Sequence, residues 1–111
     1  MENGVELKEV VSSIELEEDL KEIYLYSLDT FGKKKADNYL NSLKSVIKKL
    51  AVYYQMYSEC SQLPTKGKIY RHVVVESHVI IYRISKRIEV LRIFHSASSD
   101  CKIQTVRKVK A

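Results

Sequence analysis

Two arginines and a histidine in the run VIIYRISKRIEVLRIFH, residues 79–95, are of the types that could do chemistry on a phosphate. Arg83 and Arg92 interrupt stretches of aliphatic residues, and His95 closes the run. Guanidinium groups can hold a phosphate, and a nearby imidazole can act as a proton donor. Arg83, Arg92 and His95 could therefore act together as a phosphate clamp and an acid. A single histidine at a strand end is more often structural, so both interpretations stay open.

Size and charge bound the possible functions. The chain has 111 residues, of which 45% are hydrophobic and 30% charged, which is typical of one globular domain over residues 1–111. We expect 1–4 and 102–111 to be flexible ends. The net charge of +5 favours an acidic partner, such as nucleic acid or an acidic protein segment. A soluble basic surface with no such partner would give the same charge.

The cysteines and histidines do not indicate a metal site. Cys60 and Cys101 lie outside any CxxC motif, and His72, His78 and His95 are too scattered for zinc spacing. We expect no metal and no cofactor. Two free thiols are favoured over a disulfide, because disulfides are rare in the cytosol.

The sequence also predicts a cytoplasmic protein. The N-terminal MENGVELKEV lacks the apolar region of a signal peptide. No apolar run approaches the roughly 20 residues that a membrane span requires. We therefore expect no membrane association.

Two amphipathic helices are predicted in the first half of the chain. Ser12 or Ser13 can cap the first helix, and Glu15 completes a capping-box pattern with Ser12. Gly32 is a natural helix stop because glycine tolerates positive φ. The second helix is expected over about 34–56, antiparallel to the first across a tight turn. Apolar residues at helical spacing form one face on each helix: Leu16, Leu20, Ile23, Tyr24 and Phe31, then Ala36, Tyr39, Leu40, Leu43, Ile47, Leu50, Ala51 and Tyr54.

Strands are predicted on either side of this helical hairpin. A short strand is expected within 5–12, and three β-rich runs cover 69–75, 78–84 and 87–94. The two-residue gaps between these runs predict hairpins. The expected fold is therefore α+β, with an N-terminal strand and an antiparallel helical hairpin on a three- to four-stranded antiparallel sheet.

Two-residue turns would place residue 75 opposite 78 and residue 84 opposite 87, which decides the two faces of the sheet. The face with the apolar middle is expected to pack on the helices: Arg71, Val73, Val75, His78, Ile80, Tyr82, Ile84, Arg87, Glu89, Leu91 and Ile93. Two helices cover only one side, so the other face is expected to be open. An exposed apolar face with cations is typical of a binding site. We therefore predict a partner-binding surface of Tyr70, His72, Val79, Ile81, Arg83, Val90, Arg92 and Phe94, with Val74 and Ile88 on the same face.

Two alternatives to this surface are open. Arg83 and Arg92 could be ordinary surface arginines whose stems cover apolar groups. A register slip of one residue would exchange the two faces.

The basic tail CKIQTVRKVKA could be a solvated end or part of an interface. Ile103, Val106 and Val109 recur at a spacing of three, which fits a short helix or a strand once a partner covers it. A mobile cationic tail could also reach DNA phosphates. On that reading, deletion of 102–111 should leave the fold and the binding of a protein partner intact and should weaken the activity that depends on DNA. Loss of solubility would instead mean that Ile103 and Val106 complete the core.

Two stretches resemble the RelE/ParE toxin superfamily, and together they cover about 13–100. EEDLKEIYLYSLDTFGKKKADNYLNSLKSVIKKLA is similar to the helical hairpin of these toxins, and YRHVVVESHVIIYRISKRIEVLRIFHSASSD is similar to their C-terminal strands. The resemblance rests on the order and spacing of the matching residues in both stretches. In the hairpin these are Asp19-Leu20, Ile23, Tyr26, Phe31-Gly32, Ala36 and Tyr39, and in the strands they are IIYRI, then IEVLRIFH and a nearby Asp. It implies a type II toxin that a cognate acidic antitoxin neutralises.

The superfamily has two branches with different targets. RelE-like members cut mRNA on the ribosome, whereas ParE-like members are linked to poisoning of DNA gyrase. Nucleases of this family carry a basic residue where this chain has Val79, and a His-Tyr pair where it has His95-Ser96. Their lysine-rich strand is represented here only by Arg71 and His72. The resemblance therefore favours a ParE-like toxin that inhibits growth through gyrase. The alternative is a ribosome-dependent mRNA endoribonuclease that uses Arg83, Arg92 and His95.

Overall fold

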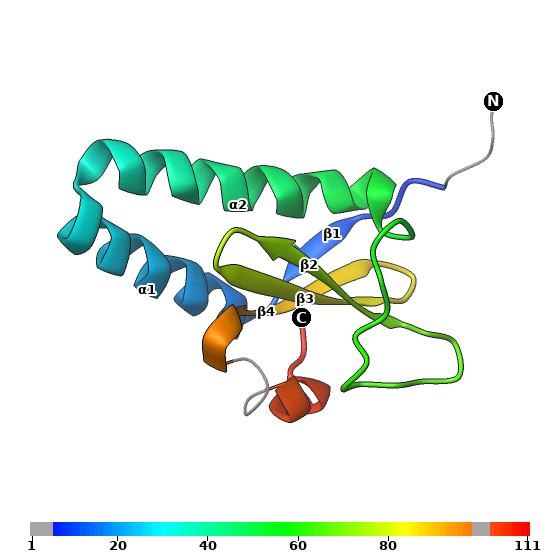
Figure 1. Cartoon of the computed structure of the whole chain (residues 1–111). Helices are drawn as coiled ribbons and strands as arrows, with labels where there is room; N and C mark the ends of the chain where they lie inside the picture. The colour runs from blue at the N-terminus through cyan, green and yellow to red at the C-terminus, as the bar shows by residue number, and fades with distance from the viewer. Residues whose placement is uncertain (1–5, 99–102) are drawn as a thin grey trace.

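The computed structural model describes residues 6–98 and 103–111. A short strand, β1 (Val10–Ser12), precedes two long helices, α1 (Ile14–Phe31) and α2 (Lys33–Tyr53). The strands β2 (Tyr70–Val75), β3 (His78–Ile84) and β4 (Ile88–His95) follow, and then two 3₁₀ turns, η1 (Ser96–Ser98) and η2 (Ile103–Lys108). The two helices lie side by side on one side of the sheet (Figure 1). The predicted α+β fold is confirmed.

The sheet is mixed rather than wholly antiparallel. Its strand order is β1-β4-β3-β2, in which β2, β3 and β4 are antiparallel neighbours and β1 runs parallel to β4. Parallel neighbours need a long crossover connection. Here the helical hairpin and the β2–β3 meander supply that connection, and the short β1 pairs only with Ile88, Glu89 and Val90.

Ser13 caps α1 and also ties the helix to the sheet. Its hydroxyl oxygen accepts the Leu16 backbone N–H at 2.9 Å, while the hydroxyl donates to the Leu91 carbonyl at 2.6 Å. The predicted start of the helix is thus confirmed, with Ser13 rather than Ser12 as the cap. Ser12 instead belongs to β1, where it pairs with Val90.

The turn between the helices depends on Gly32. Its φ of +88° and ψ of 170° lie in a region that is essentially restricted to glycine. The Gly32 N–H donates to the Leu28 carbonyl at 3.1 Å, so the residue ends α1, and α2 begins at the next position. The expected positive φ at this position is confirmed.

Gly32→Ala should therefore lower the free energy of unfolding by about 1–3 kcal/mol. A Cβ at this position would meet no atom within 4 Å, so the loss would come from backbone strain and not from a clash. Urea denaturation measures it. Gly67→Ala is the matched control, because its Cβ would make only an ordinary contact of 3.4 Å with Ile69. Equal midpoints for the two variants would show that the strain at Gly32 is negligible.

The larger core lies between the helices and one face of the sheet. It forms where the apolar stripes of α1 and α2 meet the inner side chains of the strands, as the helical periodicity predicts. Its buried members are Leu16, Leu20, Leu43, Ile47, Leu50, Tyr54, Val73, Ile80, Tyr82, Ile88, Val90 and Ile93. Phe31, which the periodicity placed on this stripe, is instead 58% exposed.

A second core covers the opposite face of the sheet, so the prediction of an open face is wrong. The loop before β2 and the C-terminal segment pack there, and η2 lies on the side of the sheet away from the helices (Figure 1). The buried members are Cys60, Leu63, Tyr70, Val79, Ile81, Leu91, Phe94, Ile103, Val106 and Val109. Cys60 is a free thiol whose pKa is raised by burial, whereas Cys101 lies outside the described residues.

The expectation of a flexible end over 102–111 is also wrong for the part that the structure describes. Ile103, Val106 and Val109 are each at most 5% exposed. Their spacing of three matches the three residues per turn of a 3₁₀ helix, which puts Ile103 and Val106 on one side of η2. The other expected flexible end, 1–4, lies outside the described residues.

The register of β4 differs from the prediction in two places. Ile84 pairs with Ile88 rather than residue 87, because the β3–β4 turn contains three residues. A bulge then adds one residue to β4 at Leu91, between the pairs Tyr82↔Val90 and Ile81↔Arg92. As a result, Ile88 and Val90 face the helices, and Leu91 faces the second core. The face assignments for the apolar residues of β2 and β3 are confirmed, as are those of Ile93 and Phe94.

Candidate functional site

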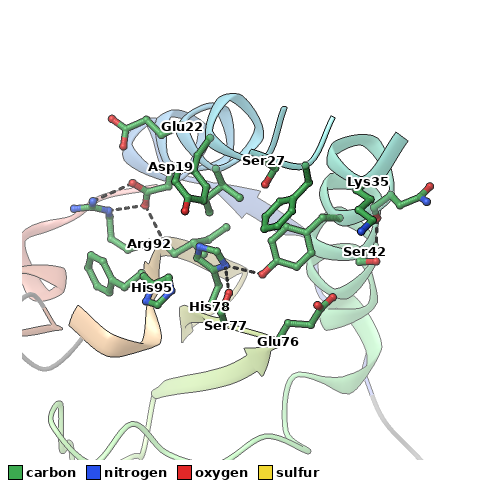
Figure 2. Close-up of a pocket in the computed structure, with 17 residues that line it drawn as sticks. Asp19, Glu22, Ser27, Lys35, Ser42, Glu76, Ser77, His78, Arg92 and His95 are labelled. Carbon is green, nitrogen blue, oxygen red and sulfur yellow. Dashed lines mark hydrogen bonds and ion pairs between the residues drawn. The ribbon is translucent and has the colours of Figure 1, made fainter. Parts of the chain in front are cut away.

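A groove of about 780 Å³ opens between the helical hairpin and the sheet. One wall consists of α1 and α2, and the other consists of the β2–β3 turn and the end of β4 (Figure 2). The lining combines aromatic, histidine and acidic side chains: Asp19, Glu22, Ile23, Tyr26, Ser27, Phe31, Lys35, Asn38, Tyr39, Ser42, Glu76, Ser77, His78, Arg92, Ile93, Phe94 and His95. Of the predicted site residues, Arg92, Phe94 and His95 are in this groove.

Tyr39 and two histidines form the polar centre of the groove. The Tyr39 hydroxyl oxygen lies 2.6 Å from His78 Nδ1 and 3.1 Å from the Val75 carbonyl oxygen. Both contacts are satisfied when Nδ1–H donates to Tyr39 and the hydroxyl donates to Val75. The rings of His78 and His95 meet edge to face, with centroids 5.4 Å apart. Within residues 6–98 and 103–111, no three His, Cys, Asp or Glu side chains are grouped so that they could hold a metal ion.

Acid should weaken the fold through His78. Burial lowers the pKa of His78 below 6.5, and the nearby His95 lowers it further, while Glu76 acts in the opposite direction. Above about pH 6.5 His78 is neutral in the folded and the unfolded chain, so its contribution to stability is fully present. Below that pH the unfolded chain takes up the proton first, and stability is lost down to the folded pKa.

We therefore expect the melting temperature to fall as the pH is lowered from about 7.5 to about 5.5. The decrease should be smaller in His78→Gln. Scanning calorimetry across this range gives the result. Glutamine keeps a hydrogen-bonding group near Tyr39 but does not titrate, so a pH dependence as steep as that of the wild type would assign the effect to other groups. His72→Gln, which changes a histidine outside the groove, is the control.

Arg92 is fixed by a carboxylate from the other end of the chain. Asp19 on α1 accepts from Arg92 Nε at 2.7 Å and from Nη2 at 3.0 Å, as Figure 2 shows. The same carboxylate accepts the backbone N–H of Ile93 at 2.9 Å. The strand β1 pairs with β4 only as far as Val90, so β1 offers no acceptor for the Ile93 N–H. Asp19 accepts that N–H instead. Hydrogen bonding to Asp19 raises the pKa of Arg92, so this guanidinium is poorly suited to give up a proton as a general acid.

Arg83 lies outside the groove, in a separate cluster on the other face of the sheet. It forms an ion pair with Glu89, its opposite neighbour on β4, and donates to the Tyr70 hydroxyl at 3.3 Å. Although burial lowers the pKa of Arg83, its bonds to Tyr70 and Glu89 raise it on balance. The structure therefore does not bring Arg83, Arg92 and His95 into one site. The phosphate clamp of the nuclease interpretation is not assembled.

The predicted partner-binding surface does not exist as an exposed face. Five of its members are at most 7% exposed because the second core or the helices cover them: Tyr70, Val79, Ile81, Val90 and Phe94. His72 is partly buried, and Arg83 and Arg92 are paired with carboxylates of the chain itself. The two arginines are thus structural cations. Asp19, the counterpart of Arg92 on α1, was not predicted to pair with an arginine.

Two exposed aromatic residues on α1 were missed by the sequence prediction. Tyr26 is 68% exposed and Phe31 is 58% exposed, and both line the groove. A signal was present in the sequence, because α1 contains more apolar residues than one face can bury. Leu25 and Leu28 are likewise exposed.

Comparison with known proteins identifies the family. The family model described as the ParE toxin of the type II toxin-antitoxin system, parDE, matches residues 12–99. The chain belongs to the ParE toxin family. Toxin ParE1 of Caulobacter vibrioides is 30% identical over 79 residues, which cover 71% of this chain and 79% of that protein. The structure of the chromosomal ParDE toxin–antitoxin system from P. aeruginosa superposes with a TM-score of 0.70 at 22% identity, over 81% of this chain and 97% of that chain.

This ParE-family membership confirms the branch that the sequence favoured. The chain is the toxin component of a type II toxin–antitoxin system, and an antitoxin is its partner. None of the helices in the described part of the chain is long and apolar enough to cross a membrane.

Proposed function

We propose that this toxin inhibits growth in the cytoplasm by poisoning DNA gyrase, and that its cognate antitoxin neutralises it by occupying the groove. The ParE family supports the first part, because the ParE-like branch is the one linked to gyrase. The separation of Arg83 from Arg92 and His95 also disfavours the nuclease alternative. The exposed aromatic rim of the groove is the observation that supports the second part.

An amphipathic antitoxin segment fits the chemistry of the groove. Tyr26 and Phe31 line it from α1 and are exposed, so apolar anchors of the partner could pack against them. Aromatic side chains contribute strongly at the centres of interfaces. Helical peptides commonly bind in such grooves through apolar residues on one face. The Lys35 ammonium on α2 offers a contact for a carboxylate of an acidic antitoxin.

Phe31→Glu tests the groove. Because Phe31 is 58% exposed, the change should leave the fold intact and weaken antitoxin binding about 30-fold or more, as at an interface hot spot. Titration calorimetry with the antitoxin measures the dissociation constant. Leu25→Glu is the matched control, since Leu25 is on the same helix, 51% exposed, and outside the groove. Equal losses for both variants would place the antitoxin on the outer surface of α1 instead.

The target is tested by expressing the toxin without its antitoxin. Gyrase poisoning should produce DNA damage with filamentation, and purified gyrase should accumulate cleaved DNA when the toxin is added. Rapid translation arrest with mRNA cut at the ribosomal A site would instead support the endoribonuclease. His95→Ala separates the two further, because the exposed His95 is the remaining acid–base candidate. The variant should stay toxic under the gyrase proposal and become harmless if the chain is a nuclease.

A further inference from the structure

Cations from three separate segments gather at the end of the sheet where β3 turns into β4. The segments are residues 64–69 of the loop before β2, the β3–β4 turn, and η2. Five exposed side chains define this cationic end: Lys66, Lys68, Lys86, Arg87 and Arg107. The loop and the turn lie at the same end of the sheet in Figure 1.

Backbone and side-chain hydrogen bonds hold the three segments together. The Ile84 N–H donates to the Ile69 carbonyl at 2.8 Å, so the β3–β4 turn lies beside the residues that precede β2. Within that loop, the Lys68 N–H donates to the Thr65 carbonyl at 3.1 Å. Arg107 joins η2 to the same loop through a bond of 3.2 Å from Nη2 to the Pro64 carbonyl. The cations are therefore presented by a fixed scaffold.

Tyr70 brings a sixth cation to this end. The Arg107 guanidinium lies 5.5 Å from the centroid of the Tyr70 ring, and the Arg83 guanidinium lies 5.8 Å from it. Each contact has the geometry of a cation–π interaction. The Tyr70 ring thus contacts both arginines.

The acidic side chains near this end are already engaged. Glu89 pairs with Arg83, and the Glu59 carboxylate accepts the Thr65 N–H at 3.4 Å. Across the described ranges, no ion pair joins a carboxylate to any of the five cations of the cationic end. The acids concentrate instead in the first half of α1: Glu15, Glu17, Glu18, Asp19 and Glu22.

We infer that the cationic end is a binding surface for the phosphate backbone of duplex DNA, an inference that rests on the proposed action of this toxin on gyrase and its DNA. Binding to a phosphate backbone requires cations and no apolar anchor, and it is independent of sequence. A protein partner would instead be expected to meet exposed apolar or aromatic groups. None of the exposed large apolar side chains of the described residues belongs to the three segments. They include Tyr26 and Phe31 in the groove, so antitoxin and DNA would use different surfaces.

Lys86→Glu together with Arg87→Glu tests the inference with the full chain and a fluorescent duplex of about 30 base pairs. Fluorescence anisotropy between about 50 and 200 mM salt gives the dissociation constant and its salt slope. We expect the double variant to bind at least about tenfold more weakly, with a log–log slope smaller by about two. Both residues are exposed and lie in a turn, so the fold should persist. If it does not, Lys66→Gln with Lys68→Gln is expected to reduce the slope in the same way.

The matched control is Lys44→Glu with Lys48→Glu, which makes the same change of charge on the exposed face of α2. It should alter DNA affinity by less than about twofold. Equal losses for the two double variants would overturn the inference, because only the net charge would then matter. Unchanged DNA binding by the first variant would also overturn it.

Antitoxin affinity provides the remaining readout. It should be the same for the wild type and for the double variant Lys86→Glu with Arg87→Glu, which should lose only DNA binding. Loss of antitoxin affinity with intact DNA binding would overturn the inference and assign the cationic end to an acidic protein segment. DNA binding is measured without gyrase, so the two proposals can fail separately. A toxin that binds DNA but does not inhibit gyrase would refute the proposed target and would still support the cationic end as a DNA-binding surface.

Discussion

Removal of residues 103–111 should abolish the native fold. Ile103, Val106 and Val109 are buried against the second face of the sheet, and burial of each such side chain contributes about 1.5–3 kcal/mol. The sum is comparable with the roughly 5–15 kcal/mol that stabilises a typical domain. The deletion would also expose Leu91 and Phe94 to water. We therefore expect an insoluble or unfolded product, and loss of toxicity would follow from loss of the fold.

Circular dichroism and urea denaturation would measure this effect. Deletion of Lys110 and Ala111, which are both exposed, is the control and should leave the unfolding midpoint unchanged. A milder test is Val106→Ala, which should cost about 2 kcal/mol, while Lys108→Ala on the exposed side of η2 should cost nothing measurable. Cooperative unfolding of the truncated chain at the wild-type midpoint would show that the second core does not need the C-terminal segment.

Asp19→Ala should lower the free energy of unfolding by about 3–5 kcal/mol, because it leaves a largely buried guanidinium without its partner. The side chains of Asp19 and Arg92 are only 10% and 26% exposed. The substitution also leaves the Ile93 N–H at the edge of β4 unsatisfied. Urea denaturation gives the difference. Asp29→Ala, an exposed change on the same helix, is the control and should have no measurable effect.

A second variant separates the ion pair from the backbone contact. Arg92→Met removes the cation and keeps the bond from Ile93 to Asp19. Replacement of a buried pair by apolar groups can be nearly neutral, so Asp19→Leu combined with Arg92→Met should recover part of the loss. The part that is not recovered measures the Ile93 bond. If Asp19→Ala unfolds at the same urea concentration as the wild type, α1 is held to β4 by apolar packing alone.

The pairing of Arg92 with Asp19 also shows why the function of the arginines was misjudged from the sequence. Both arginines stood in apolar runs, and an open sheet face was the simplest place for them. In the structure, each guanidinium forms an ion pair with a carboxylate of the same chain. Glu89 is close to Arg83 in the sequence, whereas Asp19 is 73 residues away from Arg92. A contact at that separation leaves no local pattern in the sequence.

The sequence by itself determined the elements whose signals are local. The helical hairpin follows from the period of its apolar stripes, the turn follows from the backbone freedom of Gly32, and the inner faces of β2 and β3 follow from alternation. The order and spacing of residues in two stretches were also enough to indicate the toxin family by resemblance.

Only the tertiary structure decided the rest. Alternation cannot reveal the three-residue turn or the bulge at Leu91, since one extra residue moves every later side chain of β4 to the other face. The parallel pairing of β1, the burial of Ile103, Val106 and Val109, and the groove rimmed by Tyr26 and Phe31 all depend on which distant segments meet. Those meetings are set by the burial of apolar surface over the whole chain, which no single stretch of sequence specifies.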